Sequence, residues 1–411
     1  MGRTRVKRAY KYRFYPTAQQ KHDLLRTFGC VRKVYNLALE ERTRAWFTEQ
    51  RRVNYAQTSA LLTGWKRSEE LSYLGEVSSV PLQQALRHLQ GAFASFFDKR
   101  AKYPRFKSRK KSGQSAEYTK SGFTWRAGRL MLAKMREPLD IVWSRPLPEG
   151  AEPSTVTVSR DAADRWFVSI LVETSTEYYA PTRQAVGVDA GLDALATLST
   201  GEKVTNPKHE RRDRARLAKA QRELSRKQKG SNNRARARRK VARVYARTTD
   251  RRKDHLHKVT TRLVRENQTV VIEDLQVRNM LGNHGLARAI SDAAWRDFRT
   301  MLEYEATWYG REVIAVDRWL PSSKTCSACG RLAARMPLHV RTWTCANERC
   351  GAVHDRDVNA AKNILAAGLA VSACGAGVRP QREPSRTGQS ARKQELSGAS
   401  RKAIPALQSG E

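Results

Sequence analysis

Polar and hydrophobic positions alternate near the start of the chain and then change to a helical spacing. Residues 7–15 alternate basic with aromatic side chains, which is the period-two pattern of a strand with one packed and one positive face. Pro16 and Thr17 then open a region in which apolar residues recur at three- and four-residue spacing as far as Phe97. We therefore expect a strand followed by a small helical domain over residues 18–102.

The pattern returns to short strands after a break at Tyr103. Residues 117–180 contain several β-rich runs that can pair with the N-terminal strand. The sequence therefore predicts a β-domain formed by residues 1–17 and 103–180, into which the helical domain is inserted.

From Ala185 onward, apolar strand-like runs alternate with helical segments, a pattern typical of α/β folds. The strands are expected at 186–200, 268–273 and 313–316, and the helices at 207–260, 287–309 and 357–370. This makes the whole chain a multidomain α+β protein. Its later parts are predicted to be an α/β domain at 181–320 and 352–372, an insert at 321–351, and a disordered tail at 373–411.

Charge separates this chain from most globular proteins. Its 411 residues include 78 Lys and Arg against 40 Asp and Glu, a formal net charge of +38. Such a protein repels itself unless a polyanion neutralises it, so nucleic acid is the expected partner. The alternative is a basic membrane-surface protein, but the basic segments lack the interleaved apolar face of a membrane helix. With no signal peptide and no membrane span in view, we expect a cytoplasmic protein.

Basic residues are most concentrated over residues 207–260, which hold 21 Lys and Arg against 5 Asp and Glu, a net charge of +16. A turn signal at 230–233 predicts two helices folded back on each other. A charge run is usually a solvated face, but this excess favours phosphate contacts. The candidates for these contacts are Arg234, Arg236, Arg238 and Arg239. Basic residues beside aromatic ones add further candidates for RNA contact, namely Lys11, Arg13, Arg105 and Lys107.

Four of the six cysteines are grouped in the insert. They are Cys326, Cys329, Cys345 and Cys350, with two, fifteen and four residues between successive members. Two short turns that each supply two thiolates are typical of a closed, structural zinc site. The alternative is a set of unrelated reduced thiols. Cys30 and Cys374 stand alone and are expected to be buried or idle.

Three acidic residues stand where an RNase H-like core carries its metal-binding carboxylates. Asp189 and Glu273 end apolar strands, and Asp357 opens the last helix. Phosphodiester hydrolysis by two Mg²⁺ ions about 4 Å apart needs such carboxylates to hold and bridge the metals. Taken singly, Asp189 could be a turn residue and Asp357 a helix N-cap. Asp274 and Asp355 compete for the second and third roles, although the helix directly after Asp357 favours that residue.

The chain resembles the TnpB family of transposon-encoded, RNA-guided DNA nucleases related to the type V CRISPR effectors. The resemblance covers nearly the whole sequence. It rests on the segments 11–16, 28–36, 104–107, 187–191, 272–274, 321–330 and 354–361.

This resemblance implies a β-barrel wedge domain, an inserted helical recognition lobe, a RuvC nuclease domain and a zinc-ribbon insert that binds target nucleic acid. It also implies a guide RNA from the transposon end, which pairs with double-stranded target DNA beside a short motif read by protein. The residues that similarity suggests for reading this motif are Tyr55, Ser59, Gln83 and Thr119. The expected cofactors are two Mg²⁺ ions and one Zn²⁺ ion. We also expect a monomer bound to one RNA. Its expected location is the cytoplasm of a bacterium or archaeon, where it would be associated with the nucleoid when bound to DNA.

Three other functions are compatible with parts of the pattern. A guided DNA-binding regulator without cleavage would be favoured by the loss of one acid, but all three are present. A transposase proper would also need to recognise DNA ends and transfer strands, which a three-carboxylate core alone does not exclude. An inactive zinc-ribbon RNA-binding protein leaves the order of the three acids unexplained.

Overall fold

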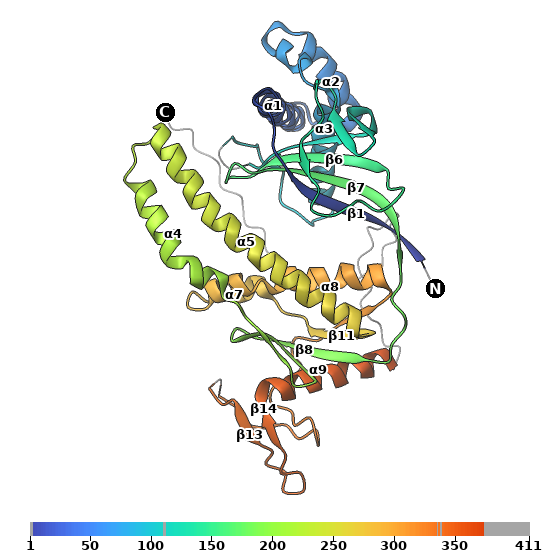
Figure 1. Ribbon diagram of the computed structural model, residues 1–411, viewed down its shortest axis with the longest axis vertical. Helices are drawn as coiled ribbons and strands as arrows, with labels where there is room; N and C mark the ends of the chain where they lie inside the picture. The colour runs from blue at the N-terminus through green and yellow to red at the C-terminus, as the bar shows by residue number, and fades with distance from the viewer. Residues whose placement is uncertain (1–2, 110–111, 335, 338, 374–411) are drawn as a thin grey trace.

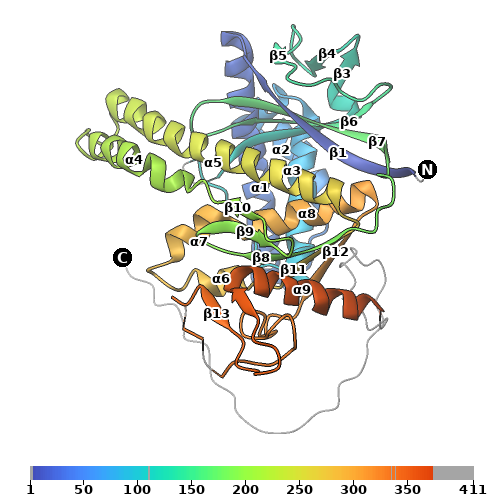
Figure 2. The same cartoon turned by 60° about the horizontal axis from the view of Figure 1, so that its bottom comes forward.

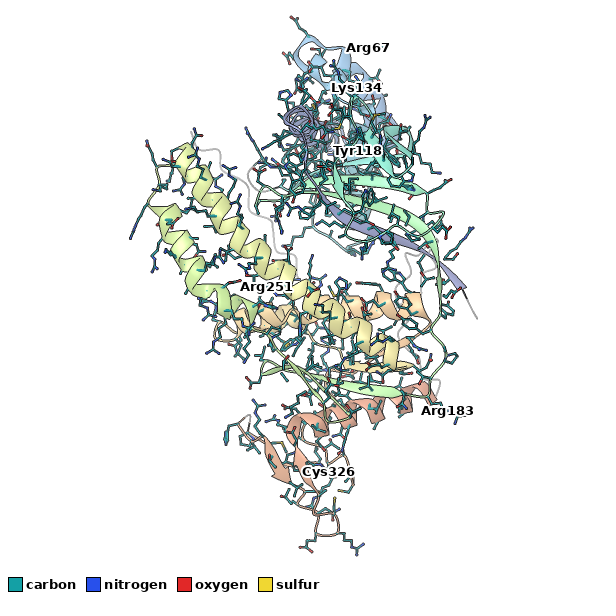
Figure 3. The ribbon with its side chains drawn as sticks, viewed as in Figure 1. Arg67, Tyr118, Lys134, Arg183, Arg251 and Cys326 are labelled. Carbon is teal, nitrogen blue, oxygen red and sulfur yellow. The ribbon has the colours of Figure 1, made fainter. Side chains whose placement is uncertain are left out.

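The computed structural model describes residues 3–109, 112–334, 336–337 and 339–373 of the chain. Three parts follow one another along the long axis of the molecule (Figure 1). An antiparallel sheet with helices lies at one end, an α/β unit in the middle, and a small cysteine-rich segment at the other end. Figure 3 marks this spread, with Arg67 of the helical part near one end and Cys326 near the opposite end. Residues 374–411, which include Cys374 and nearly all of the predicted tail, lie outside the described residues.

The N-terminal sheet is antiparallel, with the strand order β2-β6-β7-β1-β5. β1 pairs with β7 along its full length. Because successive side chains of a strand point to opposite faces, Tyr10, Tyr12 and Phe14 are buried together on one face of β1. The five strands are β1 (Arg3–Phe14), β2 (Gln114–Thr119), β5 (Ile141–Val142), β6 (Pro153–Arg160) and β7 (Trp166–Glu177).

A separate hairpin closes over the same core. Its strands are β3 (Phe123–Arg126) and β4 (Arg129–Leu132), and Leu130 and Leu132 are buried with the aromatic residues of β1. The sheet is built from residues on both flanks of the helical segment, and its assignment as one domain stays a prediction. Among the described residues the strand pairs end at β2 and β5, so closure into a barrel stays a prediction.

The helical part belongs to two cores at once. Its elements are α1 (Ala18–Glu49), α2 (Tyr55–Arg67), the 3₁₀ helix η1 (Glu69–Gly75) and α3 (Ser79–Phe97). α1 begins with a capping box, in which the Thr17 hydroxyl accepts from the Gln20 N–H and the Gln20 side chain accepts from the Thr17 N–H. Leu24 and Phe28 then pack into the core of the sheet, whereas residues 30–39 of the same helix pack against α3. α1 therefore joins the sheet rigidly to the helices.

The α/β unit has a sheet with the strand order β10-β9-β8-β11-β12. β8, β9 and β10 form an antiparallel meander, and β11 and β12 continue the sheet in parallel with β8. Helices α5, α7 and α8 cover one face and α9 covers the other (Figures 1 and 2). The strands are β8 (Ala185–Ala190), β9 (Ala194–Leu198), β10 (Lys203–Thr205), β11 (Thr269–Glu273) and β12 (Glu312–Val316). The helices packed on them are α7 (Ala287–Ala293), α8 (Trp295–Tyr309) and α9 (Arg356–Ala373), with the short α6 (Val277–Met280) beside α7.

The basic segment forms the two helices predicted for it, α4 (His209–Ser225) and α5 (Asn232–Glu266). They lie side by side, and their connected ends project from the body of the molecule (Figure 2). The far end of α5 packs on the α/β sheet through Leu256 and Leu263, which are buried. Most of the hairpin is therefore free to present basic side chains outward.

The cysteine-rich segment lies between β12 and α9 and contains one short antiparallel pair, β13 (Thr342–Thr344) and β14 (Val353–Asp355). β14 runs directly into α9, so the segment and the last helix are joined without a linker. Within the described ranges no helix is long and apolar enough to cross a membrane.

Candidate functional site

Asp189 and Glu273 project from the same face of the α/β sheet. In β8, Val186 and Val188 are buried against α5 and α8, so the alternation of the strand turns Gly187 and Asp189 to the opposite face. β11 repeats this arrangement, because Val271 packs on the α9 side and Glu273 shares its face. β8 and β11 are parallel neighbours in register, with Val188 opposite Ile272. The two acids therefore end adjacent strands on the face that α9 covers.

Two glycines let α9 lie directly on this face. A Cβ atom on Gly187 of β8 would come within 2.1 Å of the Ala361 carbonyl oxygen and 2.8 Å of the Leu365 Cβ. A Cβ atom on Gly368 of α9 would come within 2.4 Å of the Val271 side chain. At Gly187 the strand backbone meets the backbone of α9, and at Gly368 the helix backbone meets the Val271 side chain; such close approach is the usual reason for glycine. This close contact brings Asp357, in the first turn of α9, to the ends of β8 and β11.

Asp189 lies close enough to Glu273 and Asp357 for their charges to act on it. Burial, then the charges of Glu273 and Asp357, raise the pKa of Asp189 to about 7, and the nearby Arg356 opposes this only in part. Burial also raises the pKa of Glu273, whose Oε1 accepts a hydrogen bond from Ser322 Oγ at 3.0 Å. Asp357 Oδ1 lies 3.5 Å from Arg341 Nη1. Carboxylate oxygens are the ligands that hard cations prefer, so these three acids are candidates for holding one.

The two competing acids have other partners. Asp274 lies one residue past Glu273 and accepts from Arg299 of α8 at 2.6 Å. It also faces Arg318 at 3.4 Å. Asp355 caps α9 by accepting from the Asp357 and Val358 N–H groups, both at 3.1 Å, and it is paired with Lys203 Nζ at 2.7 Å. Because these contacts occupy Asp274 and Asp355, Glu273 and Asp357 are the better candidates for binding a metal ion.

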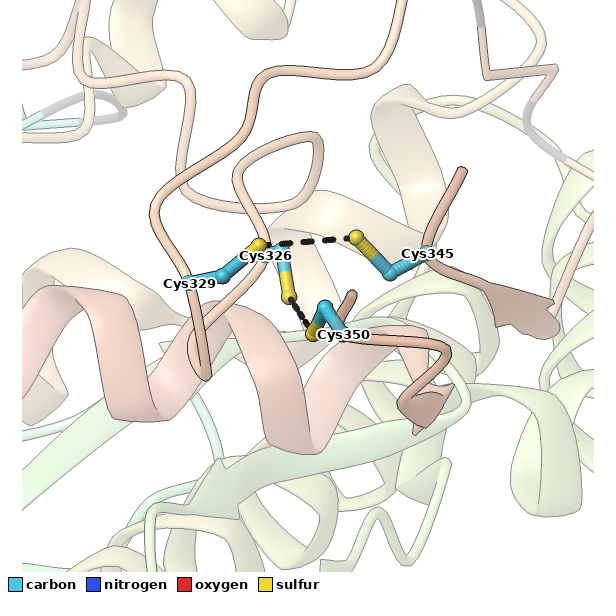
Figure 4. Close-up of side chains that lie close together, drawn as sticks. All are labelled: Cys326, Cys329, Cys345 and Cys350. Carbon is cyan, nitrogen blue, oxygen red and sulfur yellow. Dashed lines mark hydrogen bonds between the residues drawn. The ribbon is translucent and has the colours of Figure 1, made fainter. Parts of the chain in front are cut away.

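The four cysteines form a compact cluster (Figure 4). Their sulfur atoms all lie within 4.8 Å of one another. The Cys326 and Cys350 sulfurs are 3.8 Å apart, and the Cys329 and Cys345 sulfurs are 3.6 Å apart. Four sulfurs at about 2.3 Å from a central zinc ion would be about 3.8 Å from one another, so the cluster has the size of a tetrahedral zinc site.

His354 was not foreseen as part of this cluster. Its Nε2 lies 3.0 Å from Cys326 Sγ, and its side chain is buried against Trp343. Burial lowers the pKa of His354, which favours the neutral ring. A ring N–H aimed at a ligating sulfur would stabilise the thiolate, as outer-shell donors do around metals. The only sequence signal was its position one residue before Asp355.

Hydrogen bonds from two asparagines of α9 hold the cysteine-rich segment on this helix, a role that no sequence pattern had indicated. Asn359 is buried; its Oδ1 accepts from the Ser327 N–H at 2.8 Å, and its Nδ2 donates to the Thr325 carbonyl at 2.7 Å. Asn363 donates to the Ser322 and Thr325 carbonyls at 2.7 and 2.6 Å. Because Ser322 also donates to Glu273, one polar network links the cysteine cluster, α9 and the carboxylates.

The residues suggested for motif reading lie on neighbouring elements of the N-terminal part. Tyr55 and Ser59 are on α2, Gln83 is exposed on α3, and Thr119 ends β2. Arg87 of α3 stacks over the Tyr55 ring at 5.0 Å. The contact of these residues with DNA stays a prediction.

Several of the suggested RNA-binding residues already have partners within the chain. Lys11 and Arg13 both stack on Phe167, at 4.1 and 5.3 Å. Lys107 stacks on Tyr35 at 4.0 Å. Arg234 donates to two carbonyls at the end of α4, and Arg239 is 3.3 Å from Asp164 of the β6–β7 turn. The candidates that are exposed are Lys11, Arg105, Arg236 and Arg238.

Comparison with known proteins agrees with this arrangement. A family model described as a probable transposase, OrfB of IS605, matches residues 168–284. A model of the Cas12f1-like TNB domain matches residues 295–364, and a helix-turn-helix model of IS605 OrfB matches residues 1–51. In the structure, residues 1–51 contain β1 and the single helix α1.

Two curated relatives span almost the whole chain. A Streptomyces pristinaespiralis protein is 72% identical over 95% of this chain and 96% of its own length, and carries the provisional name RNA-guided DNA endonuclease. An Escherichia coli K12 protein, provisionally named RNA-guided DNA endonuclease InsQ, is 34% identical over 89% of this chain and 94% of its own length. Among solved structures, a Cas12f1–sgRNA–target DNA complex matches with a TM-score of 0.55 and 12% identity, over 88% of this chain and 98% of that one. A likeness at that identity describes the fold alone.

Proposed function

This chain belongs to the TnpB family of IS605 OrfB proteins, and from that premise we propose that it is an RNA-guided DNA endonuclease. The observation that supports the proposal is that Asp189 and Glu273 end adjacent strands of one sheet and that the charges of Glu273 and of Asp357 on α9 both act on Asp189. The relatives' names and the charge of +38 support nucleic acid as the partner.

We propose that the α/β unit is an RNase H-like, RuvC-type nuclease domain. Its support is the strand order, in which an antiparallel meander of β8, β9 and β10 continues into parallel β11 and β12. In the same proposal the N-terminal sheet is the wedge, α1 to α3 are the recognition lobe, and the cysteine-rich segment is the target-binding insert. The nuclease domain comprises residues 181–320 with 352–372, and the wedge comprises residues 1–17 with 103–180. The recognition lobe comprises residues 18–102, and the target-binding insert comprises residues 321–351.

The donor set fits two Mg²⁺ ions, because carboxylate oxygens are the ligands that this hard cation prefers. Bound there, the ions would supply an activated water and stabilise the leaving oxygen of the phosphodiester. Asp189 would help to hold the ions from the end of β8. Ser322 fixes one oxygen of Glu273 and leaves the other free. Asp357 is held at the start of α9, where Asp355 caps the helix backbone.

The four thiolates fit one Zn²⁺ ion in a closed site, which makes its role structural. The hydrogen bonds of Asn359 and Asn363 then connect this small, metal-dependent segment to the helix that carries Asp357. Zinc in this account stabilises the surroundings of the nuclease site and takes no part in the chemistry.

A guide RNA derived from the transposon end is the proposed polyanion for the basic helices α4 and α5. Arg236 and Arg238 are exposed on α5, and neither is ion-paired among the described residues. Base pairing would select the DNA, and Tyr55, Ser59, Gln83 and Thr119 would read the adjacent motif. We expect one protein chain per RNA.

The second candidate is a guided DNA-binding regulator without cleavage, and the third is a transposase proper. The regulator does not explain why two strands and one helix, far apart in sequence, carry three acids near one another beside closely packed glycines, whereas a transposase could use the same acids. A regulator has no use for the repulsion among these acids. A transposase would in addition need a surface that recognises DNA ends.

The test is purification of the protein from cells that carry its gene with the native downstream flank, followed by sequencing of the bound RNA. A discrete RNA that ends in transposon-flank sequence supports the guided nuclease. Heterogeneous RNA, or none, would contradict it, and binding to DNA ends would then support the transposase.

A further inference from the structure

The helical part contains a cavity between α1 and α3. Its volume is about 390 Å³, within the roughly 300–1,000 Å³ range of small-molecule sites. One wall is the last third of α1, with Arg42 and Trp46. The opposite wall is the end of α3, with Phe93 and Phe97, and Tyr103 closes one side. The rim is formed by residues 51–54, which turn across the end of α1 after Gln50 adopts a left-handed conformation, with φ at 49°.

The rings around this cavity are partly packed on one another and partly open. Phe93 and Phe97 are stacked with centroids 6.2 Å apart, and Tyr103 meets Phe93 edge-on at 5.5 Å. The Tyr103 hydroxyl is fixed by Thr43 Oγ1 at 2.9 Å. Phe97 is nevertheless 66% exposed and Trp46 is 41% exposed. Large aromatic faces left open at the mouth of a cavity are available for stacking with a flat ligand.

Two arginines give the cavity its charge. Arg42 is only 8% exposed, stacks on Phe93 at 5.0 Å and donates to Gln90 Oε1 at 2.6 Å, while its Nε has no hydrogen-bond partner in the described structure. Arg52 stacks over Trp46 at 5.7 Å, and no acidic residue in the described part of the chain pairs with it. A buried N–H without a partner is costly, and a ligand acceptor would relieve that cost.

Rings open for stacking, a buried donor and an unpaired cation together match one kind of ligand. We propose that this cavity binds a single unpaired nucleotide, with the base stacked on Phe97 and Trp46 and the phosphate beside Arg52. Base stacking on aromatic side chains with arginine nearby is the general way in which proteins hold single-stranded nucleic acid. A second copy of this chain is a poorer occupant, because both copies would bring the charge of +38.

The proposal rests on the proposed function in one respect, that nucleic acid is the partner. The nucleotide could come from an unpaired part of the guide RNA or from the DNA, because bases of both stack on aromatic side chains in the same way. The test is ultraviolet crosslinking of the purified protein–RNA complex, with and without target DNA, followed by mass spectrometry of the peptides. We expect a nucleotide attached to peptides that contain Trp46 or Phe97. A ribonucleotide found without DNA identifies the RNA as its source, and a deoxynucleotide found only after DNA is added identifies the DNA.

A matched pair of variants separates stacking from general surface effects. Phe97→Ala removes an exposed ring that lines the cavity, and Phe47→Ala removes an equally exposed ring, 69% exposed, that does not. Phe97→Ala should weaken nucleic-acid binding about tenfold and abolish the crosslink, whereas Phe47→Ala should change neither. Phe97→Trp keeps an aromatic ring at this position and should retain both the nucleic-acid binding and the crosslink.

Three results would overturn the proposal. The first is crosslinking at α4 and α5 with none at the cavity peptides, which leaves the guided nuclease intact. The second is an equal effect of the two alanine variants. The third is a complex that contains two protein chains and becomes single in Phe97→Ala, which would make the occupant a second copy. Failure of the protein to purify with any nucleic acid would instead refute the proposed function together with this site.

Discussion

Asp189→Asn should make the metal-free protein more stable while it removes cleavage. The substitution keeps the size of the side chain and deletes its charge. In the wild-type protein, burial and the neighbouring Glu273 and Asp357 raise the pKa of Asp189 from an ordinary 3.8 to about 7. The folded state therefore favours the protonated carboxyl, and ionising it at higher pH costs stability.

The size and the sign of the effect follow from linkage. The folded pKa lies about three pH units above the ordinary value, which corresponds to about 4 kcal/mol as an upper limit. Below about pH 4 the carboxyl is protonated in both states and costs nothing. The cost grows as the pH rises through this window and is fully present above about pH 7, where both states are ionised. Asn at this position avoids it, so the variant should gain stability over the wild type near pH 8 and little near pH 4.

Hydrogen exchange measures this change where it should occur. Peptides from β8 and α9 report opening of the nuclease unit without assuming that the whole multidomain chain unfolds in one step. Variant and wild type are compared at the same pH, so intrinsic exchange rates cancel. Asp254→Asn is the matched control, because it deletes the same charge from a side chain that is 64% exposed on α5. Added Mg²⁺ should stabilise the wild type and the Asp254→Asn protein, but Asp189→Asn much less.

Two results would refute this reasoning. The first is an Asp189→Asn protein that is less stable than the wild type near pH 8. The second is a gain in stability that is the same at low and high pH, since neither the burial of the Asp189 charge nor its repulsion by neighbouring acids acts where the carboxyl is protonated.

Three further predictions follow from the packing and the polar network. Cys326→Ser should release zinc, measured as metal content, and should loosen the insert; an unchanged zinc content would contradict the four-thiolate site. Gly187→Ala would place a Cβ 2.1 Å from the Ala361 carbonyl oxygen, so α9 must shift and cleavage should fall at least tenfold. The control is Gly64→Ala, where nothing lies within 4 Å; it should leave cleavage unchanged and stabilise α2 by about 0.5–1 kcal/mol. Equal effects of the two substitutions on cleavage would refute the close-contact argument. Asn359→Ala leaves buried backbone groups unpaired and should cost about 1–3 kcal/mol, seen as faster exchange of the α9 peptides; unchanged exchange would show that this tie is not needed.

Local pattern was sufficient to find most strands and helices of the α/β unit, although β10 and the short α6 were not predicted and α7 and α8 were predicted as one helix. The apolar runs before Asp189 and Glu273 predicted β8 and β11, and the turn signal at residues 230–233 predicted the α4–α5 hairpin. These features depend on the periodicity of one segment at a time, which a sequence displays directly.

Tertiary contacts account for what the pattern left open. Whether Glu273 or Asp274 joins the site depends on which face of β11 meets α9, and the pairing of Asp274 with Arg299 becomes visible only in three dimensions. The sharing of α1 between two cores, through Leu24 and Phe28, has the same origin. The helical spacing of residues 18–49 shows that a face is buried, but it does not show against what.

Side-chain partners were the least predictable feature. His354 was identified only as a neighbour of the acids, yet its ring contacts Cys326. Arg234 and Arg239 were predicted to bind phosphate, and the structure shows that both already contact other parts of the chain. A basic residue that anchors a helix and one that binds RNA look alike in sequence, because both are simply long cations.

The central claim is that the protein uses Asp189, Glu273 and Asp357 to cleave DNA that is selected by base pairing with a guide RNA. The most direct test is cleavage of a plasmid by the purified protein–RNA complex in Mg²⁺, after the guide portion of the RNA has been replaced with a new sequence. The account predicts that the cut moves to the DNA that matches the new guide, requires Mg²⁺, and is absent with Asp189→Asn. Cutting that ignores the guide, or that persists in Asp189→Asn, would contradict it.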